Sequence, residues 1–314
     1  MSSNLDSNGI TLIVCTHNRA DLLFKLLDSI DAARPCESPV DVLIIANNCK
    51  DETESLLEAR VRSRPVGSLK LSWRAEPTPG KSNALNHALR VAQGDWFAFI
   101  DDDQRLDEAF LVALDRAVRA NSEVELLCGQ LLPDWTGDEP AWVHDQGRFR
   151  IYPLPVPHYY LGDTGTDIGR DGPLPSGGNL IVRRDATARV GPFATHLGPV
   201  GHNLAGAEDM EWLTRAFNAG LRLRYEPTII QRHYVDLDRL RMSYLLRLTY
   251  TRTADSIAIL PGARSKGVPL WVIRKLLGYA LRAATSWTAA ARRFYLMRCA
   301  AALGEVRGYS KGMR

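Results

Sequence analysis

The sequence predicts an α/β protein whose central sheet is doubly wound and mostly parallel, followed by a C-terminal helical extension. Short apolar runs rich in β-branched residues alternate with amphipathic stretches in the first 120 residues. Polar clusters directly follow several of these runs, and beyond Leu237 all patterns are helical. Strands alternating with helices indicate a parallel sheet covered on both faces, and such sheets bind ligands at the carboxyl ends of their strands.

The elements follow one another in a regular order. Buried strands are predicted at Ile10–Cys15, Val40–Ala46, Leu69–Trp73 and Asp95–Ile100. The helices between them extend up to Ala33, over Asp51–Arg64 and over Gly80–Gln93. The later elements are a regular segment at Gly177–Arg183, a helix from about Ala207, and strands at about Leu221–Tyr225 and Thr228–Gln231. Pro133–Pro175 is rich in Pro, Gly, Asp and aromatic residues without a period, which predicts a long functional loop or lid.

Length and composition are those of a globular protein. The 314 residues fit two domains, or one large α/β domain with an appendage. Five scattered cysteines form no CxxC pair, which argues against a disulfide framework or a zinc knuckle and favours a reducing cytosol. Residues 1–9 are polar, lack the pattern of a signal peptide and are expected to be flexible.

Charge is distributed unevenly along the chain. Arg239–Arg314 contains 15 basic and two acidic residues, a net +13, whereas the rest carries 24 basic and 34 acidic residues, a net −10. Aromatic residues and leucines are interleaved with this charge over Leu270–Leu303. Two interpretations stay open: amphipathic helices packed on the body, with an oligomer contact as a variant, or an interfacial helix on anionic lipid. No apolar run reaches the roughly 18 residues of a membrane span, and no groove-reading motif supports nucleic-acid binding.

Three adjacent carboxylates, Asp101, Asp102 and Asp103, follow the strand predicted at Asp95–Ile100. Such carboxylates repel one another unless a cation or hydrogen-bond donors are present. Mg²⁺ and Mn²⁺ prefer oxygen ligands and need few from the protein when phosphates supply the rest. The run is either an acidic turn that caps the helix near Asp107 or a metal and phosphate site, and its place at a strand end favours the second interpretation.

Two later segments also contain candidate catalytic or metal-binding side chains. Glu208 and Asp209 precede a helical run, where acidic residues complement the helix dipole. The glycine-rich run Gly198–Gly206 upstream would let the backbone approach a ligand, which suits a general base at this helix start. His233 ends a strand-like run and is either structural or a metal ligand.

The segments combine into a pattern. The turn Asn47–Lys50 and the helix start Gly80–Lys81 could bind a nucleotide, because helix N-termini attract phosphate. In order along the chain stand VCTHNR, NNCKDET, PGKSNALNHAL, GDWFAFIDDD with a DxD at its end, GGNLIVRRD, AEDMEW and EPTIIQRHYV. With these motifs, Ile10–Val235 resembles the family 2 glycosyltransferases, which have the GT-A fold.

The resemblance implies a metal-dependent, inverting enzyme that transfers one hexosyl group from a nucleotide-diphosphate-sugar to an acceptor hydroxyl. It implies Mg²⁺ or Mn²⁺, a UDP-sugar rather than a GDP- or dTDP-sugar, and a glycan or lipid-linked acceptor in bacterial-type surface polysaccharide or glycolipid assembly. Residues 10–120 would bind the nucleotide-sugar, 121–236 the acceptor, and 237–314 would form the basic helical extension. The expected location is the cytoplasm, either free or peripheral at the inner face of the plasma membrane.

Roles carried over by position follow from the same resemblance. Asp209 would be the base, with Glu208 as the next candidate, and Asp103 and His233 would hold the metal. Asp101 would face the ribose and the metal. The remaining candidates are the nucleotide contacts Thr16, Arg19, Asn47, Asn48, Asp51, Lys81 and Asp102, together with Gly178 and Asn179. Because the metal stabilises the departing diphosphate, one carboxylate suffices to deprotonate the acceptor, and direct displacement inverts the anomeric centre.

The sequence departs from the family pattern at three points. Ala46 stands where many relatives have an aspartate that reads the base, so Asn47 or Asn48 would do that work. His17 and Cys15 replace a common Tyr and Pro. The QxxRW motif of processive synthases is absent, which favours single addition. The alternatives are a non-catalytic membrane-surface scaffold, disfavoured because the acidic residues and the histidine are all retained, and a nucleotidyltransferase, whose glycine-rich loop is missing.

Overall fold

A computed structural model describes residues 9–197, 208–258 and 267–310. These residues divide into two compact units. The sheet unit contains the described residues up to Asp134 and those from His158 to Tyr234. The helical unit contains Trp135–Pro157 and the described residues from Val235 onward. Residues 10–120 and 121–236 were expected as two functional halves. Both stretches lie in the sheet unit, except for 135–157 and 235–236, which belong to the helical unit. Of the expected flexible segment 1–9, Gly9 alone is described.

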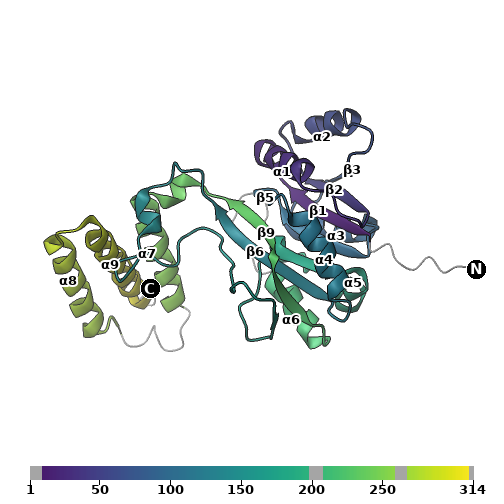
Figure 1. Cartoon of the computed structure of the whole chain (residues 1–314). Helices are drawn as coiled ribbons and strands as arrows, with labels where there is room; N and C mark the ends of the chain where they lie inside the picture. Colours follow the sequence, from purple (N-terminus) through teal and green to yellow (C-terminus); the bar gives the residue numbers. More distant parts are fainter. Residues whose placement is uncertain (1–8, 198–207, 259–266, 311–314) are drawn as a thin grey trace, which may run out of the picture. The chain divides into compact units, whose positions relative to one another are not determined.

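The sheet unit is built on one sheet of nine strands within the described residues (Figure 1). The order is β3-β2-β1-β4-β8-β6-β9-β5, with β7 paired to β9. Six strands run in one direction, and β5, β7 and β8 run against them. The strands are β1 (Ile10–Thr16), β2 (Val40–Asn47), β3 (Lys70–Glu76), β4 (Trp96–Asp101), β5 (Gln104–Leu106), β6 (Leu126–Asp134), β7 (Thr166–Ile168), β8 (Leu180–Arg183) and β9 (Leu223–Tyr234). The predicted mostly parallel α/β class is confirmed.

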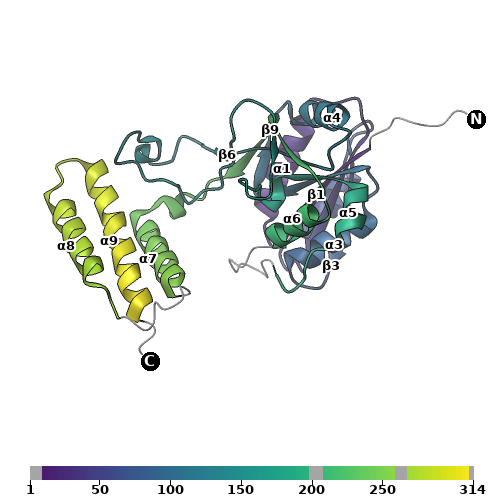
Figure 2. The same cartoon turned by 90° about the horizontal axis from the view of Figure 1, so that it is seen from below.

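Helices cover both faces of this sheet, as Figure 2 shows. One core is formed with α1, α2 and α4, and the other with α3, α5 and α6. Side chains alternate along a strand, so Leu12 and Val14 enter the first core and Ile13 enters the second. The helices are α1 (Ala20–Ala32), α2 (Thr53–Arg62), α3 (Lys81–Val91), α4 (Phe110–Ala120), α5 (Arg184–Val190) and α6 (Glu208–Asn218), with the 3-10 turn η2 (Gly177–Asn179) before β8. The double winding predicted from the alternating pattern is therefore present.

The strands predicted at Leu221–Tyr225 and Thr228–Gln231 are one strand, β9, so this part of the prediction was wrong. Pro227 has no N–H for a ladder hydrogen bond, which is why it suggested a break. The structure accommodates it with a register shift against β6 at Gly129. The bulge lets β9 continue to its pairing with β5.

The segment predicted as a loop or lid, Pro133–Pro175, is divided between the two units. Its part Trp135–Pro157, with the 3-10 turn η1 (Ala141–His144), packs in the helical unit. There Arg293 Nη2 donates to Asp145 Oδ2 at 2.9 Å, and the ring of Phe149 contacts two aromatic rings of the last helix. This part is therefore a packing element of the helical unit.

The helical unit consists of η3 (Leu237–Leu240), α7 (Met242–Ala258), α8 (Leu270–Thr285) and α9 (Ala289–Ser310). α9 lies between α7 and α8 (Figures 1 and 2). Small residues bring α9 close to α7: a Cβ on Gly304 would lie 2.5 Å from the Tyr250 carbonyl oxygen, and one on Gly308 would lie 2.7 Å from that of Ala254. None of the described helices combines the length and apolar composition needed to cross a bilayer.

Candidate active site

Polar side chains from distant parts of the sequence meet at one edge of the sheet. β2, β1 and β4 are parallel neighbours, so their carboxyl ends lie side by side. These ends carry Thr16, Asn47 and Asp101, each followed by a polar turn. This is the edge at which doubly wound sheets bind ligands.

Asp102 is buried at this edge and held by two donors. Thr16 Oγ1 donates to Asp102 Oδ2 at 2.7 Å, and Arg19 Nη1 donates to Asp102 Oδ1 at 3.1 Å. Burial raises the pKa of Asp102 to about 6; Arg19 opposes this shift, and the adjacent Asp103 adds to it. Thr16 and Asp102, both expected as nucleotide contacts, thus bond to each other.

Asp103 and His233 come together because β5 pairs with β9. His233 Nε2 lies 3.2 Å from Asp103 Oδ1. His233 Nδ1 lies 2.8 Å from the carbonyl oxygen of Tyr234, which can only accept, so this contact places a proton on Nδ1. The other ring nitrogen, Nε2, faces the carboxylate. Apart from this contact, the buried Asp103 Oδ1 has no hydrogen-bond partner among the described residues.

A carboxylate oxygen and an imidazole nitrogen that lie this close together are side-chain groups that ligate divalent cations. Arg19 Nη1 donates to the other oxygen of Asp103 at 3.1 Å and so orients the carboxylate. The described residues contain no group of three or more metal-ligating side chains. The protein would therefore supply one carboxylate and one imidazole, and phosphate oxygens and water would complete the coordination, as Mg²⁺ commonly requires.

Lys81, at the start of α3, forms an ion pair with Asp101. Lys81 Nζ donates to Asp101 Oδ1 at 2.5 Å. Burial opposes the charge on Asp101, but Lys81 outweighs it and holds the pKa of Asp101 below its usual range. Burial likewise opposes the charge on Lys81, yet Asp101 keeps the pKa of the ammonium above its usual range. Both groups are therefore charged at neutral pH.

Gly178 and Gln104 close the space behind Asp101. A Cβ on Gly178 would lie 2.2 Å from Asp101 Oδ2, so no larger residue fits there. Gln104 Oε1 accepts from the Asp101 N–H at 3.3 Å, while its buried Nε2 has no hydrogen-bond partner in the described part of the chain. Sequence reasoning does not single out Gln104; its one signal is its place directly after the acidic run.

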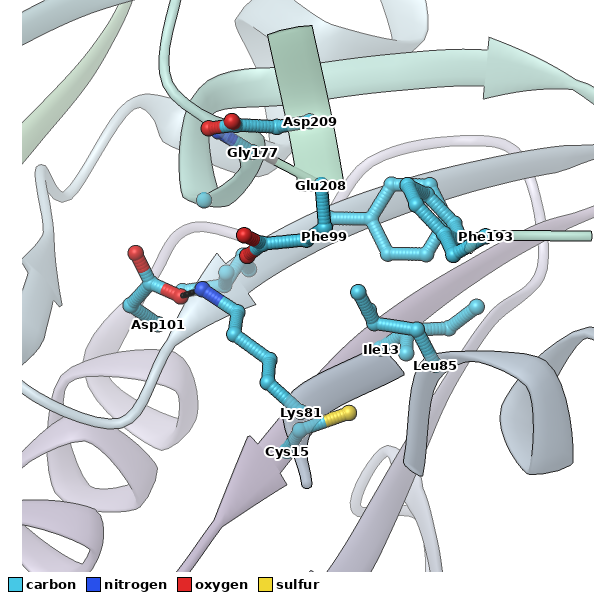
Figure 3. Close-up of a pocket in the computed structure, with 12 residues that line it drawn as sticks. Ile13, Cys15, Lys81, Leu85, Phe99, Asp101, Gly177, Phe193, Glu208 and Asp209 are labelled. Atoms are coloured by element: carbon cyan, nitrogen blue, oxygen red, sulfur yellow. Dashed lines mark hydrogen bonds and ion pairs between the residues drawn. The ribbon is translucent and has the colours of Figure 1, made fainter. Parts of the chain in front are cut away.

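A pocket lies beside the ion pair (Figure 3). Its apolar lining includes Ile13, Leu85, Phe99 and Phe193, and its charged lining consists of Lys81, Asp101, Glu208 and Asp209. Glu208 points its carboxylate toward Lys81 and Asp101. Glu208 is 4% exposed, and its Oε2 has no hydrogen-bond partner among the residues described. Burial raises the pKa of Glu208, against the attraction of Lys81.

Asp209 contributes an oriented carboxylate to the same pocket from the first turn of α6. The N–H of Gly177 donates to Asp209 Oδ2 and the N–H of Met210 donates to Oδ1, each at 2.8 Å. A half-buried carboxylate fixed in this way can accept a proton from a ligand in the pocket. The glycine-rich run Gly198–Gly206, expected to approach a ligand, lies outside the described residues.

Two other expected nucleotide contacts are engaged with the backbone. Asn47 Nδ2 donates to the carbonyl oxygens of Glu76, at the end of β3, and Thr78, in the loop before α3, at 3.2 and 2.7 Å. Its Oδ1 accepts from the N–H of Gly80 at 2.9 Å. Asp51 accepts from main-chain N–H groups at the starts of α1 and α2. Of the two asparagines expected to read the base, Asn47 therefore anchors the loop, and Asn48 is the one left for a ligand.

Asparagines also shape three turns around the site. Asn18 and Asn48 have φ values of 52° and 48°, a left-handed conformation that asparagine tolerates. Asn18 Oδ1 accepts from the N–H of Lys50 at 2.7 Å and so joins the turns after β1 and β2, a contact that sequence reasoning missed. The amide of Asn179 bonds to both backbone groups of Gly129 in β6, at 3.1 and 2.8 Å. Asn179 is therefore a positioning residue for η2.

The doubly wound, mostly parallel sheet with an acidic run at the end of β4 has the GT-A fold. Residues 11–188 match the family model described as "Glycosyl transferase family 2". Because the match covers more than half of the chain, the chain belongs to this family and is a glycosyltransferase.

Two relatives align with most of the chain. The succinoglycan biosynthesis protein ExoM of Rhizobium meliloti is 25% identical over 239 residues, which are 76% of this chain and 71% of ExoM. Glycosyltransferase AglE of Haloferax volcanii is 24% identical over 227 residues, 71% of this chain and 66% of AglE. The chain thus spans slightly less than two thirds of AglE.

Solved structures share the fold. S. aureus TarS 1-349 in complex with UDP-GlcNAc has a TM-score of 0.55 and 16% identity, over 94% of this chain and 90% of that one. The mannosyltransferase PcManGT from Pyrobaculum calidifontis, in complex with GDP-Man and Mn²⁺, has a TM-score of 0.54 and 19% identity, over 97% and 86%. A longer TarS chain is covered over 40% of its length. At these identities the likeness establishes the fold alone.

Proposed function

We propose that the protein is a metal-dependent, inverting glycosyltransferase that transfers one hexosyl group from a nucleotide-diphosphate-sugar to an acceptor hydroxyl. The observation that carries this proposal is the pair Asp103 Oδ1 and His233 Nε2, which face each other at 3.2 Å beside the acidic run at the end of β4. Such a pair suits a divalent cation, and family membership supplies the reaction class.

Asp103 and His233 would hold Mg²⁺ or Mn²⁺. When bound, the ion would neutralise the charge of the departing diphosphate, so the protein needs no acid for the leaving group. Arg19 orients Asp103 and offsets part of the negative charge of the acidic run. Asn48 is proposed to contact the nucleobase of the donor, because the amide of Asn47 is engaged with the backbone.

Asp209 would act on the acceptor. The acceptor oxygen forms a bond to the anomeric carbon as the bond from that carbon to the diphosphate oxygen breaks. The electron pair leaves with the diphosphate, and the hydroxyl proton passes to Asp209. A single displacement from the opposite face inverts the configuration. The backbone N–H groups of Gly177 and Met210 hold the receiving carboxylate in place.

We further propose a UDP-sugar as the donor, a glycan or lipid-linked acceptor, and a place in surface polysaccharide or glycolipid assembly. ExoM is named for succinoglycan biosynthesis, and TarS has been solved with UDP-GlcNAc, which support this choice. PcManGT holds GDP-Man with Mn²⁺, so GDP is the comparison that the test must include.

Calorimetry with UDP and GDP, in Mn²⁺ and in EDTA, tests both the metal requirement and the choice of nucleobase. We expect UDP to bind in Mn²⁺ and to lose about 10-fold or more of its affinity in EDTA, because an ion held by Asp103 and His233 would offset the charge of the diphosphate. Equal affinity in EDTA would contradict the metal site, and tighter binding of GDP would replace UDP as the donor nucleotide. Product analysis with a nucleotide-sugar panel then identifies the sugar and the anomeric configuration.

A further inference from the structure

The helical unit carries an apolar surface that sugar transfer does not use. Four large aliphatic side chains of α8 are exposed: Leu270 (74%), Ile273 (37%), Leu277 (65%) and Leu281 (65%). Their spacing of three, four and four residues places them on one face of the helix, which we call the α8 stripe. The buried positions Val272 and Ala283 lie on the other side, where α8 packs on α9. α8 is therefore apolar on two faces, and one of them has no partner in the described part of the chain.

The surroundings of the stripe are basic. α8 contains Arg274, Lys275 and Arg282 and no acidic residue, and α8 with α9 contains seven basic residues against the single acidic Glu305. Glu305 is engaged by Lys275 Nζ at 2.6 Å, so the other six charges are not compensated within the two helices. A second copy docking through the same stripe would bring like charges together, which disfavours it as the occupant.

Tryptophans stand at both ends of α8. Trp271 is 54% exposed, with Lys275 Nζ 4.8 Å from its ring centroid. Trp287, in the turn to α9, is 100% exposed. Indole rings beside basic side chains settle at the boundary between lipid headgroups and acyl chains.

We propose that the α8 stripe binds the surface of an anionic lipid bilayer. The helix would lie in the plane of the interface, with the leucines at the acyl boundary and Arg274 and Arg282 among the anionic headgroups. The attachment is peripheral, because α8 has 16 residues and no described helix can span a bilayer. The proposal goes beyond sugar transfer, and it would bring the enzyme to a membrane surface.

The test is co-sedimentation of the full-length protein with vesicles of phosphatidylcholine alone or mixed with an equal part of phosphatidylglycerol. We expect binding to the anionic vesicles at low salt, weakened by about 10-fold or more in pure phosphatidylcholine or at high salt, because charge attraction is screened. The double variant Leu277→Glu/Leu281→Glu should lose about 10-fold or more of this binding, whereas Leu277→Phe/Leu281→Phe should keep it.

The matched control places the same two charges on the sheet unit. Leu56 and Val66 are exposed apolar residues there, at 40% and 106%, so Leu56→Glu/Val66→Glu should leave vesicle binding unchanged. Circular dichroism and UDP calorimetry on every variant separate folding and donor binding from lipid binding. If the unaltered protein binds neither UDP nor GDP in Mn²⁺, the proposed function is contradicted and the vesicle result still stands.

Three outcomes would overturn the proposal. The unaltered protein could ignore anionic vesicles at low salt, or the control variant could lose binding as fully as the stripe variant. Sedimentation equilibrium could also show a dimer that Leu277→Glu/Leu281→Glu converts to monomers while vesicle binding stays unchanged. The stripe would then be a contact between copies of the chain.

Discussion

The carboxyl edge of the sheet and the α8 stripe depart from the usual distribution of side chains in opposite ways. At the sheet edge, carboxylates are buried: Asp102 is 5% exposed and Glu208 is 4% exposed. On α8, Leu277 and Leu281 are each 65% exposed. Buried polar groups and contiguous exposed apolar groups are the informative exceptions in a folded protein, because each costs stability unless something binds there.

The two regions differ in how far the chain itself offsets that cost. Thr16, Arg19 and Lys81 satisfy most of the acidic atoms at the sheet edge, and a few such as Asp103 Oδ1 have no hydrogen-bond partner among the described residues. Among the described residues, none covers the α8 stripe in this way. The sheet site is thus preorganised for a small ligand, whereas the exposed stripe suits an extended surface such as the proposed bilayer.

The largest expected effect on turnover comes from the proposed catalytic base, Asp209. Asp209→Asn keeps the size of the side chain but removes proton acceptance, so kcat should fall by roughly 10²-fold or more while UDP binding survives. Steady-state kinetics with calorimetry measures both. Asp95→Asn is the control, because Asp95 is an exposed carboxylate at the opposite end of β4. If Asp209→Asn keeps most of its kcat, the base lies elsewhere, and Glu208→Gln is the next variant to assay.

The metal pair should give the next largest effect. Asp103→Asn and His233→Ala each remove one of the two proposed metal ligands, so UDP affinity in Mn²⁺ should fall by about 10-fold or more. The difference between Mn²⁺ and EDTA should disappear in the same variants, as calorimetry can show. A variant whose UDP binding still depends fully on Mn²⁺ would mean that other groups hold the ion.

Alanine substitutions at one crowded glycine in each unit allow a direct comparison of their effects on turnover and stability. Gly178→Ala must displace Asp101, so it should lower turnover, whereas Gly308→Ala crowds α7 and should cost about 1–3 kcal/mol of stability with turnover unchanged. Gly278→Ala on α8 meets no atom within 4 Å and should stabilise by up to about 1 kcal/mol through helix propensity. Urea unfolding and kinetics on the three variants test this. Loss of turnover in a fully stable Gly308→Ala protein would couple the two units and contradict the comparison.

The smallest effect concerns the buried carboxylate of Glu208. Its raised pKa means that the folded state binds this proton more tightly than the unfolded state, so the group adds stability as pH falls and costs stability above the raised pKa. Glu208→Gln should therefore raise Tm at pH 7.5, by about 2 °C for each kcal/mol regained, and the difference should shrink toward acid pH. Calorimetric scans across pH test this, with Glu58→Gln as the exposed control. A lower Tm for Glu208→Gln at pH 7.5 would show that attraction to Lys81 outweighs burial.

The early strands and helices could be predicted because their signals are local. The predicted strand at Ile10–Cys15 differs from β1 by one residue, since a continuous apolar run is buried on both faces of a parallel sheet. β9 could not be predicted as one strand, because the bulge that admits Pro227 depends on Gly129 of β6, about a hundred positions earlier. Bulges are set by the partner strand, which no local pattern records.

The candidate site, like the fold, could be predicted only in part. Motifs identified the acidic run, Glu208–Asp209 and His233 as candidates, and their roles stay predictions. The bond from Thr16 to Asp102 and the engagement of Asn47 with its loop could not be read from sequence, because hydrogen-bond partners are chosen by tertiary contacts. Gln104 escaped notice for the same reason: its importance lies in its packing against Asp101.

The sequence by itself determined the alternation of strands and helices, the chemistry available at the strand ends, the family, and the concentration of positive charge after Arg239. These features depend on residue types and spacing within one segment. Only the tertiary structure decided which buried polar atoms lack a hydrogen-bond partner among the described residues, as Asp103 Oδ1 does, and which apolar side chains remain exposed, as on α8. Pairing and exposure depend on neighbours from distant segments, so they exist only once the chain is folded.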